Sequence, residues 1–206
     1  MKSALAAALI LATTALSGTA LSGTAFAQAS RDVSAVQAGS YNVDPDHTQV
    51  NWAVNHLGFS IYHGRFDKVS GTLTVDPKTA ANDKLDVTID TGSINTPSPT
   101  LTGELIGDKW FNAKQFPAIT FKSTKVAAAG RDHAKVTGDL TLHGVTKPVT
   151  LDVAFLGAGP NPFFKVYTLG FQATGTIKRS DFGVTTYAPA IGDETTLTLS
   201  GAFLKP

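Results

Sequence analysis

The chain has 206 residues, of which 42% are apolar and 9% aromatic, and it contains no cysteine. This length and composition favour one globular domain with a packed core, and the absence of cysteine excludes disulfides, a thiolate nucleophile and a zinc–thiolate site. The formal net charge is +1, and it becomes zero when the N-terminal segment that contains Lys2 is removed. A protein without net charge has no strong electrostatic field that would attract nucleic acid or an anionic membrane surface.

The first 27 residues have the organisation of a secretory signal peptide. A positive start at Lys2 precedes the apolar stretch 4–16, and the segment ends in an A-x-A cleavage site. We therefore expect cleavage between Ala27 and Gln28. The alternative is a membrane-spanning helix, but the apolar stretch is shorter than the about 20 residues that a span requires. The sequence predicts a secreted protein that keeps no membrane span after processing.

A flexible arm and a first strand are expected next. Residues 28–40 are small and polar without a period, which is typical of a mobile terminus, and the folded domain is expected to cover 41–206. Residues 49–56 alternate between apolar and polar character, which predicts a strand with one buried face. The buried parity comprises Val50, Trp52, Val54 and His56. Residues 59–64 are interpreted as a connection.

The same alternation returns in seven further segments, each bounded by turn-forming residues. They are 69–75, 85–90, 119–123, 136–142, 149–155, 169–177 and 197–203. Most connections between them are too short for parallel crossovers, so the strands are expected to be antiparallel. Eight such strands predict a mainly β fold, either a closed barrel or a two-sheet sandwich.

One segment departs from this pattern, between the third and fourth predicted strands. Residues 100–113 carry apolar side chains at roughly helical spacing, whereas Gly103 and Gly107 each cost about 1 kcal/mol relative to alanine in a helix. We expect a short, imperfect helix here, placed as a lid or plug at one end of the barrel.

Small residues on the inward parity of several strands have two interpretations. Gly71, Gly138, Ala173, Gly175 and Gly201 stand where a filled core would carry leucine or valine. They either leave lengthwise space for a small ligand, which an eight-stranded barrel is just wide enough to hold, or mark bulges and bends needed for closure. The residues alone leave both interpretations open.

Several spaced motifs resemble the YceI-like family of polyisoprenoid-binding proteins. The first is Y-x-V-D-P-x-H-T-x-V-x-W-x-V-x-H in 41–56, followed by L-G-F-S and G-R-F. The others are W-F-N with F-P-A-I-T-F in 110–121, G-D-L-T-L-H-G-V-T-K-P-V in 138–149, I-K-R-S-D-F-G in 177–183 and I-G-D-E in 191–194. The resemblance covers residue 41 to the C-terminus. It implies a lipocalin-like, eight-stranded antiparallel barrel that holds a long polyisoprenoid or similar amphiphile, in a periplasmic or secreted protein without known catalysis.

The polar residues give no pattern for catalysis or metal binding. The five histidines lack H-x-x-x-H or H-E-x-x-H spacing, no serine lies in a G-x-S-x-G motif, and no glycine-rich phosphate loop precedes a helix. His47 and His143 are expected to hydrogen-bond in turns. Arg179 and Asp181 flank Ser180 in a turn and are interpreted as a surface pair or as partners of a hydrogen bond in that turn. No catalytic residue, metal or cofactor is therefore predicted, apart from a bound lipid.

The leading hypothesis is a carrier or store for an isoprenoid lipid, of quinone or prenyl-phosphate type, in the periplasm. His56 is placed near the barrel mouth, where it either meets a polar head group or serves a structural role, which is the favoured interpretation. The expected ligand-binding residues are Val50, Trp52, Val54, His56, Leu73, Phe121, Leu140, Phe155, Leu169, Phe171, Ile177 and Leu199. An enzyme that uses His56 on a small hydrophobic substrate and a ligand-free interaction barrel are the alternatives, and a homodimer is left open.

Overall fold

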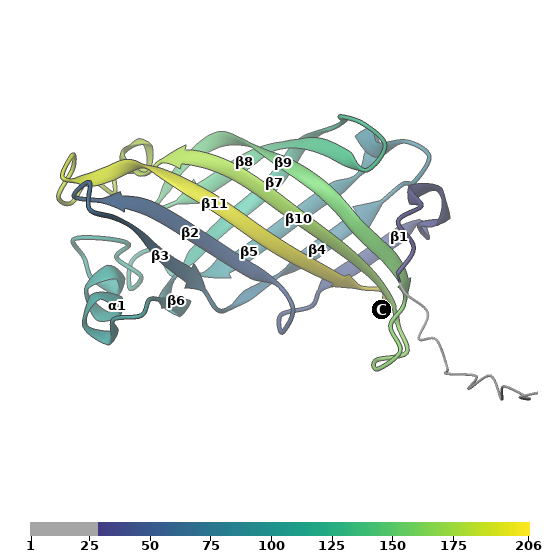
Figure 1. The fold of residues 1–206 in the computed structure, drawn as a ribbon, viewed down its shortest axis with the longest axis horizontal. Helices are drawn as coiled ribbons and strands as arrows, with labels where there is room; N and C mark the ends of the chain where they lie inside the picture. The colour runs from purple at the N-terminus through teal and green to yellow at the C-terminus, as the bar shows by residue number, and fades with distance from the viewer. Residues whose placement is uncertain (1–28) are drawn as a thin grey trace, which may run out of the picture.

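The computed structural model describes residues 29–206, so the predicted signal peptide and its cleavage site between Ala27 and Gln28 lie outside the described residues. The described chain is mainly β, with one α-helix, α1 (Pro99–Ile106). Figure 1 shows long, tilted strands arranged around a common axis, with α1 and β1 at opposite ends. The strands are β1 (Gly39–Val43), β2 (Gln49–His56), β3 (Ser60–Phe66), β4 (Val69–Val75), β5 (Lys84–Asp90), β6 (Ile94–Asn95), β7 (Ala118–Ala128), β8 (His133–Leu142), β9 (Val145–Pro160), β10 (Tyr167–Lys178) and β11 (Ile191–Leu204).

Eight of these strands close into an antiparallel barrel. The ring runs β1-β4-β5-β7-β8-β9-β10-β11 and returns from β11 to β1, where Val43 pairs with Phe203. The earlier part of β11 pairs instead with β2, and β3 and β6 follow outward from β2. The predicted antiparallel barrel of eight strands is therefore confirmed. Its membership differs, because β1 rather than β2 closes the ring.

Three segments form strands where the sequence did not predict them, namely β1, β3 and the two-residue β6. The expected connection at 59–64 is wrong, since Ser60–Phe66 is a strand that pairs with β2 along its whole length. Residues expected in the flexible arm include the start of β1 at Gly39, and Ser30 forms an isolated bridge with Ala158. The N-terminal part of the described chain thus runs alongside β9 before it enters the barrel.

The helix lies where the sequence places it, between β6 and β7, but it is shorter than the expected 100–113. Ser98 caps its start by accepting a hydrogen bond from the backbone N–H of Leu101, and a proline occupies the first turn. Gly107 ends it, with its N–H donating to the carbonyl of Glu104. Trp110 and Phe111 follow in a turn and still face the barrel, so helix and turn together cover one end of the lumen.

The inward glycines make room for neighbouring groups that pack against them. A Cβ at Gly138 would lie 2.5 Å from the ring of Phe121, and one at Gly64 would lie 2.1 Å from the ring of Trp52. Gly71 has φ +145° and faces the backbone of β5, where a Cβ would lie 2.1 Å from the carbonyl oxygen of Asp86. Close approach therefore explains all three glycines, and for Gly71 and Gly138 the interpretation as lengthwise free space is wrong.

Candidate functional site

The lumen contains two adjoining cavities, called chamber 1 and chamber 2 below. Chamber 1 has a volume of about 300 Å³ and lies at the α1 end, where residues of β2, β3, α1 and the segment after β10 line it. Chamber 2 has a volume of about 170 Å³ and lies toward β1, between β4, β5, β8, β9 and the last two strands. Val50 lines both chambers, so they adjoin at this side chain. The lumen is therefore elongated.

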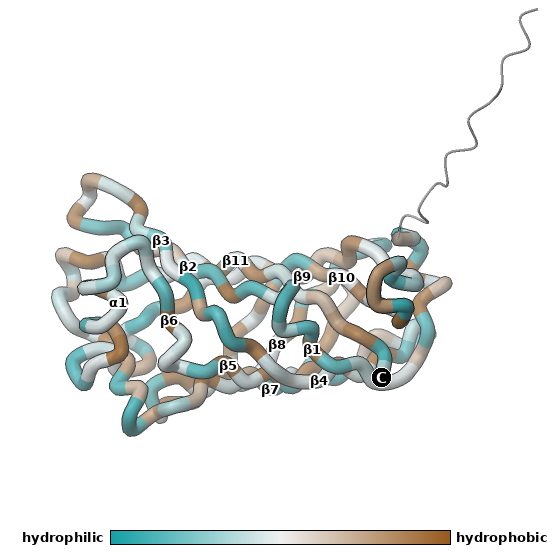
Figure 2. The backbone as a smooth tube through the Cα atoms, turned by 90° about the horizontal axis from the view of Figure 1, so that it is seen from below, coloured by the Kyte–Doolittle hydropathy of each residue, from teal (hydrophilic) through white to brown (hydrophobic). Residues whose placement is uncertain are grey.

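The inward face of β2 forms one wall of chamber 1, as its alternation predicts. The side chains that it contributes are Val50, Trp52, Val54 and His56. The ring of Trp52 packs over Gly64 of β3, and its indole N–H makes no hydrogen bond within residues 29–206. Packing on the glycine rather than hydrogen bonding thus holds this ring in the wall. Figure 2 shows the matching alternation of hydrophilic and hydrophobic positions along the strands.

Helix α1 and the turn after it cover the end of chamber 1. Leu101 and Leu105 of α1 line the chamber, together with Trp110 and Phe111 from the turn. The ring of Phe111 meets that of Phe66 on β3 edge to face, with 5.8 Å between centroids. The aromatic pair 110–111 is present in the sequence, but its contact with β3 depends on a strand that sequence reasoning missed.

Arg179 is buried beside chamber 1, so the predicted surface pair with Asp181 is wrong, whereas the alternative of a hydrogen bond in the turn agrees with the contact of Arg179 with the carbonyl of Val184. Its side chain is 6% exposed and donates three hydrogen bonds to backbone carbonyls, from Nε to Gly192 at 2.9 Å, from Nη1 to Val184 at 2.8 Å and from Nη2 to Ile191 at 2.7 Å. Asp181 instead pairs with Lys147 at 3.0 Å. Arg179 therefore holds together the two ends of the segment between β10 and β11.

The charge on Arg179 is stabilised mainly by dipoles. No carboxylate within residues 29–206 lies at salt-bridge distance from it, whereas the ring of Trp110 lies 5.7 Å from the guanidinium carbon. Burial lowers the pKa of Arg179, and the nearby carboxylate of Asp193 opposes that effect. The guanidinium is thus committed to the chain itself, which leaves the chamber wall predominantly apolar.

Chamber 2 is more uniformly aliphatic and aromatic than chamber 1. Phe171 lies between Phe155 and Phe203, at centroid distances of 5.5 Å and 5.9 Å. Polar residues occur at its edges, among them Lys84 and Asp83. Burial raises the pKa of Asp83, and this carboxylate accepts a hydrogen bond from the backbone N–H of Asp76. Chamber 2 can therefore hold an apolar chain along most of its wall.

The structure divides the twelve predicted ligand-binding residues into three groups. Val50, Trp52, Val54, His56, Leu140 and Ile177 line chamber 1. Leu73, Phe171 and Leu199 line chamber 2, together with Val50. Phe121, Phe155 and Leu169 are buried in the core and line neither chamber. The missed lining residues include Tyr62, Phe66, Leu101, Leu105, Trp110, Phe111, Arg179, Val184, Tyr187, Ile191 and Thr195. Whether these side chains bind a ligand stays a prediction.

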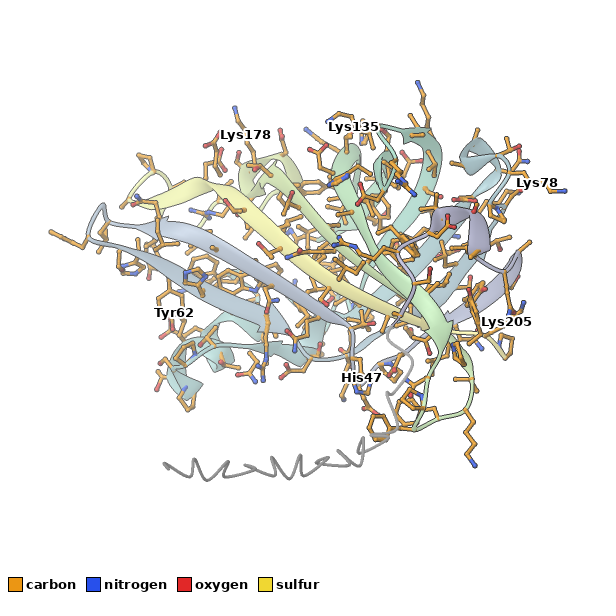
Figure 3. All side chains as sticks on the ribbon, turned by 45° about the vertical axis from the view of Figure 1, so that its right-hand side comes forward. His47, Tyr62, Lys78, Lys135, Lys178 and Lys205 are labelled. Atoms are coloured by element: carbon orange, nitrogen blue, oxygen red, sulfur yellow. The ribbon has the colours of Figure 1, made fainter. Side chains whose placement is uncertain are left out.

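The histidines occupy separate places in the fold. Nδ1 of His47 lies 2.8 Å from Oδ2 of Asp44, and Nδ1 of His143 lies 3.3 Å from the carbonyl oxygen of Phe182, which confirms their expected roles in turns. His56 faces chamber 1, with its ring 6.0 Å from that of Tyr62. Figure 3 places Tyr62 near the α1 end and Lys205 near the other. Residues 29–206 contain no group of three or more potential metal-ligating side chains.

The described part of the chain contains no helix that is long and apolar enough to span a membrane.

Comparison with known proteins agrees with this architecture. A model of the YceI-like domain matches residues 41–203. Protein YceI of Salmonella agona is 38% identical over 177 residues, which cover 85% of this chain and 92% of that protein.

Two solved structures share the fold. BcnA of Burkholderia cenocepacia superposes with a TM-score of 0.71 at 29% identity and covers 78% of this chain and 98% of BcnA. A polyisoprenoid binding domain from Saccharophagus degradans, implicated in plant cell wall breakdown, has a TM-score of 0.62 at 19% identity, covering 82% of this chain and 100% of that domain. With a barrel of the expected topology and a family match over nearly all of its strands, this chain belongs to the YceI-like family.

Proposed function

We propose that this protein binds a polyisoprenoid, of quinone or prenyl-phosphate type, or a similar long-chain amphiphile in its lumen. The observation that carries the proposal is the pair of apolar chambers that adjoin at Val50. The walls of both chambers are mostly apolar, and an extended chain that occupies both would pass Val50. The domain of Saccharophagus degradans, named for polyisoprenoid binding, supports this choice of ligand class.

Apolar burial supplies enough free energy for such binding without many polar contacts. Each methylene group removed from water contributes about 0.8 kcal/mol, so ten enclosed carbons contribute roughly 8 kcal/mol before the cost of association. Chamber 1 contains most of the aromatic lining groups, and its polar ones include His56, Tyr62 and Glu104. The head group therefore fits chamber 1 or its mouth, and the tail fits chamber 2.

Binding rather than catalysis is part of this proposal. His56 is the histidine that faces chamber 1, and within the described residues it makes no hydrogen bond to a carboxylate that would orient it as a general base. The proposed role is storage or carriage of the lipid. The predicted signal peptide supports a periplasmic location, where a water-insoluble lipid needs a soluble carrier.

Uptake from detergent micelles tests the proposed function. The purified protein is titrated with prenyl quinones, a prenyl phosphate and a straight-chain amide of similar length. We expect binding of every long-chain member with modest differences between head groups, because the chain supplies most of the free energy. Strict selection of one head group, or failure to bind any of them, would contradict the proposal.

A further inference from the structure

An apolar rim lies at the α1 end of the barrel, beside chamber 1. It consists of Leu57, Phe59, Ile61, Ile106 and Tyr187, all large apolar or aromatic side chains exposed to solvent. Phe59 is 91% exposed and Tyr187 is 68% exposed. Isolated apolar side chains on a surface are ordinary, but a group gathered at one opening indicates an interaction site.

Three segments carry the rim: the β2–β3 turn with the start of β3, the end of α1, and the segment before β11. Contacts join these segments to one another. The backbone N–H of Leu57 in the β2–β3 turn donates to the carbonyl of Ala190, which lies before β11, at 3.1 Å. The hydroxyl of Thr186 donates to the carbonyl of Lys109, and the ring of Tyr187 meets that of Trp110 with 6.1 Å between centroids. Figure 1 shows these segments together at the α1 end. The rim is thus one surface held by backbone and aromatic contacts.

The rim is continuous with the lumen. Tyr187 belongs to the rim and also lines chamber 1, so the chamber reaches the surface beside these apolar side chains. The exposed edges of chamber 2 instead include Gln49, Lys84 and Ser200. A lipid chain therefore finds an apolar route between the lumen and the outside at the rim.

Two of the three segments that carry the rim lack acidic side chains, whereas the third, at the end of α1, has Glu104 and Asp108 on either side of Ile106. No aspartate or glutamate occurs between Asp46 and Asp67, a stretch that contains the β2–β3 turn, and none occurs between Asp181 and Asp193, a stretch that contains Tyr187. These two segments can enter the head-group region of a bilayer without carrying a carboxylate into it. Because the chain without its first 27 residues has a formal charge of zero, adhesion must come from apolar side chains.

We propose that the apolar rim inserts into the surface of a lipid bilayer and opens chamber 1 toward the acyl chains. A ligand chain then passes between bilayer and lumen without crossing water. This transfer step rests on the proposed function, whereas contact between rim and bilayer does not.

Flotation with phosphatidylcholine vesicles tests the inference on the processed protein. The variants are Phe59→Ser in the rim and Phe163→Ser, which removes a side chain that is 82% exposed on the turn between β9 and β10. That turn lies at the other end of the barrel (Figure 1). Losing one inserted phenylalanine should weaken vesicle binding by about tenfold or more in Phe59→Ser, with the control variant matching the unaltered protein. High salt should leave binding unchanged.

Equal losses in both variants, no vesicle binding, or binding abolished by salt would overturn the inference. So would association of the protein with itself through the rim, detected as a dimer that Phe59→Ser dissociates and that does not float. Uptake from micelles separates the two proposals. Uptake from micelles without rim-dependent flotation would contradict the proposed bilayer contact but not the proposed function. Rim-dependent flotation without uptake would uphold bilayer contact and contradict the proposed function.

Discussion

The variant Val50→Trp is expected to weaken the binding of a long prenyl chain by about a hundredfold, because excluding four methylene groups from chamber 2 already costs about 3 kcal/mol. Val50 lines both chambers, and a tryptophan in its place would add bulk where they adjoin. A quinone with a short prenyl tail fits in chamber 1 alone. The affinity for this short ligand should fall much less. The ratio of the long-chain to the short-chain affinity, measured by titration from micelles, shows whether one chain extends through both chambers.

Two control variants separate passage from general damage. Thr198→Trp places the same bulk on an exposed position of β11. Val50→Ala removes bulk at the place where the two chambers adjoin. Both should keep the preference for the longer chain. If Val50→Trp lowers the affinities for long and short ligands equally, one chain does not occupy both chambers. The same conclusion follows if this variant keeps its native fold by circular dichroism and its affinity for the long chain is unchanged.

The second large effect is expected at Arg179. The variant Arg179→Met should lower the free energy of unfolding by about 3 kcal/mol or more, because it removes three charge-assisted hydrogen bonds and leaves their carbonyl acceptors without a donor. Arg179→Lys should restore only part of this stability, since an ammonium group is a point charge and does not reproduce the planar fork. Urea denaturation at neutral pH measures both changes.

A neighbouring ion pair provides the matched control. Asp181→Asn breaks the pair of Asp181 with Lys147, whose side chains are about half exposed, and should cost less than about 1 kcal/mol. If Arg179→Met unfolds at the same urea concentration as the unaltered protein, the carbonyl contacts of Arg179 do not hold the segment between β10 and β11. Loss of that segment's order should also expose Trp110, which shifts the tryptophan emission of the folded variant to longer wavelength.

Strand alternation predicts most of the strands but misses β3, which pairs with β2 outside the ring, for a physical reason. The inward positions of β3 are Tyr62, Gly64 and Phe66, and the middle one has no side chain. The ring of Trp52 from β2 fills this place. Only the pairing of β2 with β3 explains why Gly64 occupies an inward position. The segment taken alone therefore resembles a connection.

Arg179 shows a second limit of sequence reasoning. It lies in a polar turn next to Ser180 and Asp181, where exposure is the ordinary expectation. Its burial arises because the segment after β10 folds back and presents three carbonyls to one guanidinium. Such an arrangement depends on tertiary structure and leaves no local pattern.

The shape of the lumen was also only partly predictable. The parity of β2 identified one wall of chamber 1 correctly. Phe121 was expected in the wall as well, but it lies over Gly138 and is withdrawn into the core. Neighbouring rings and backbone fill the space beside the inward glycines, so these glycines do not create the cavities. The cavities arise from the spacing of the strands and from the position of α1, and the pattern of a single strand reveals neither.

The most direct test of lipid binding is native mass spectrometry of the processed protein isolated from its own cells, followed by organic extraction and identification of any bound lipid. We expect one molecule of a prenyl-chain lipid per protein chain, released only on unfolding or extraction. A protein without a lipid adduct, which also takes up no prenyl lipid from micelles, would contradict the proposal that the two chambers form a lipid-binding site.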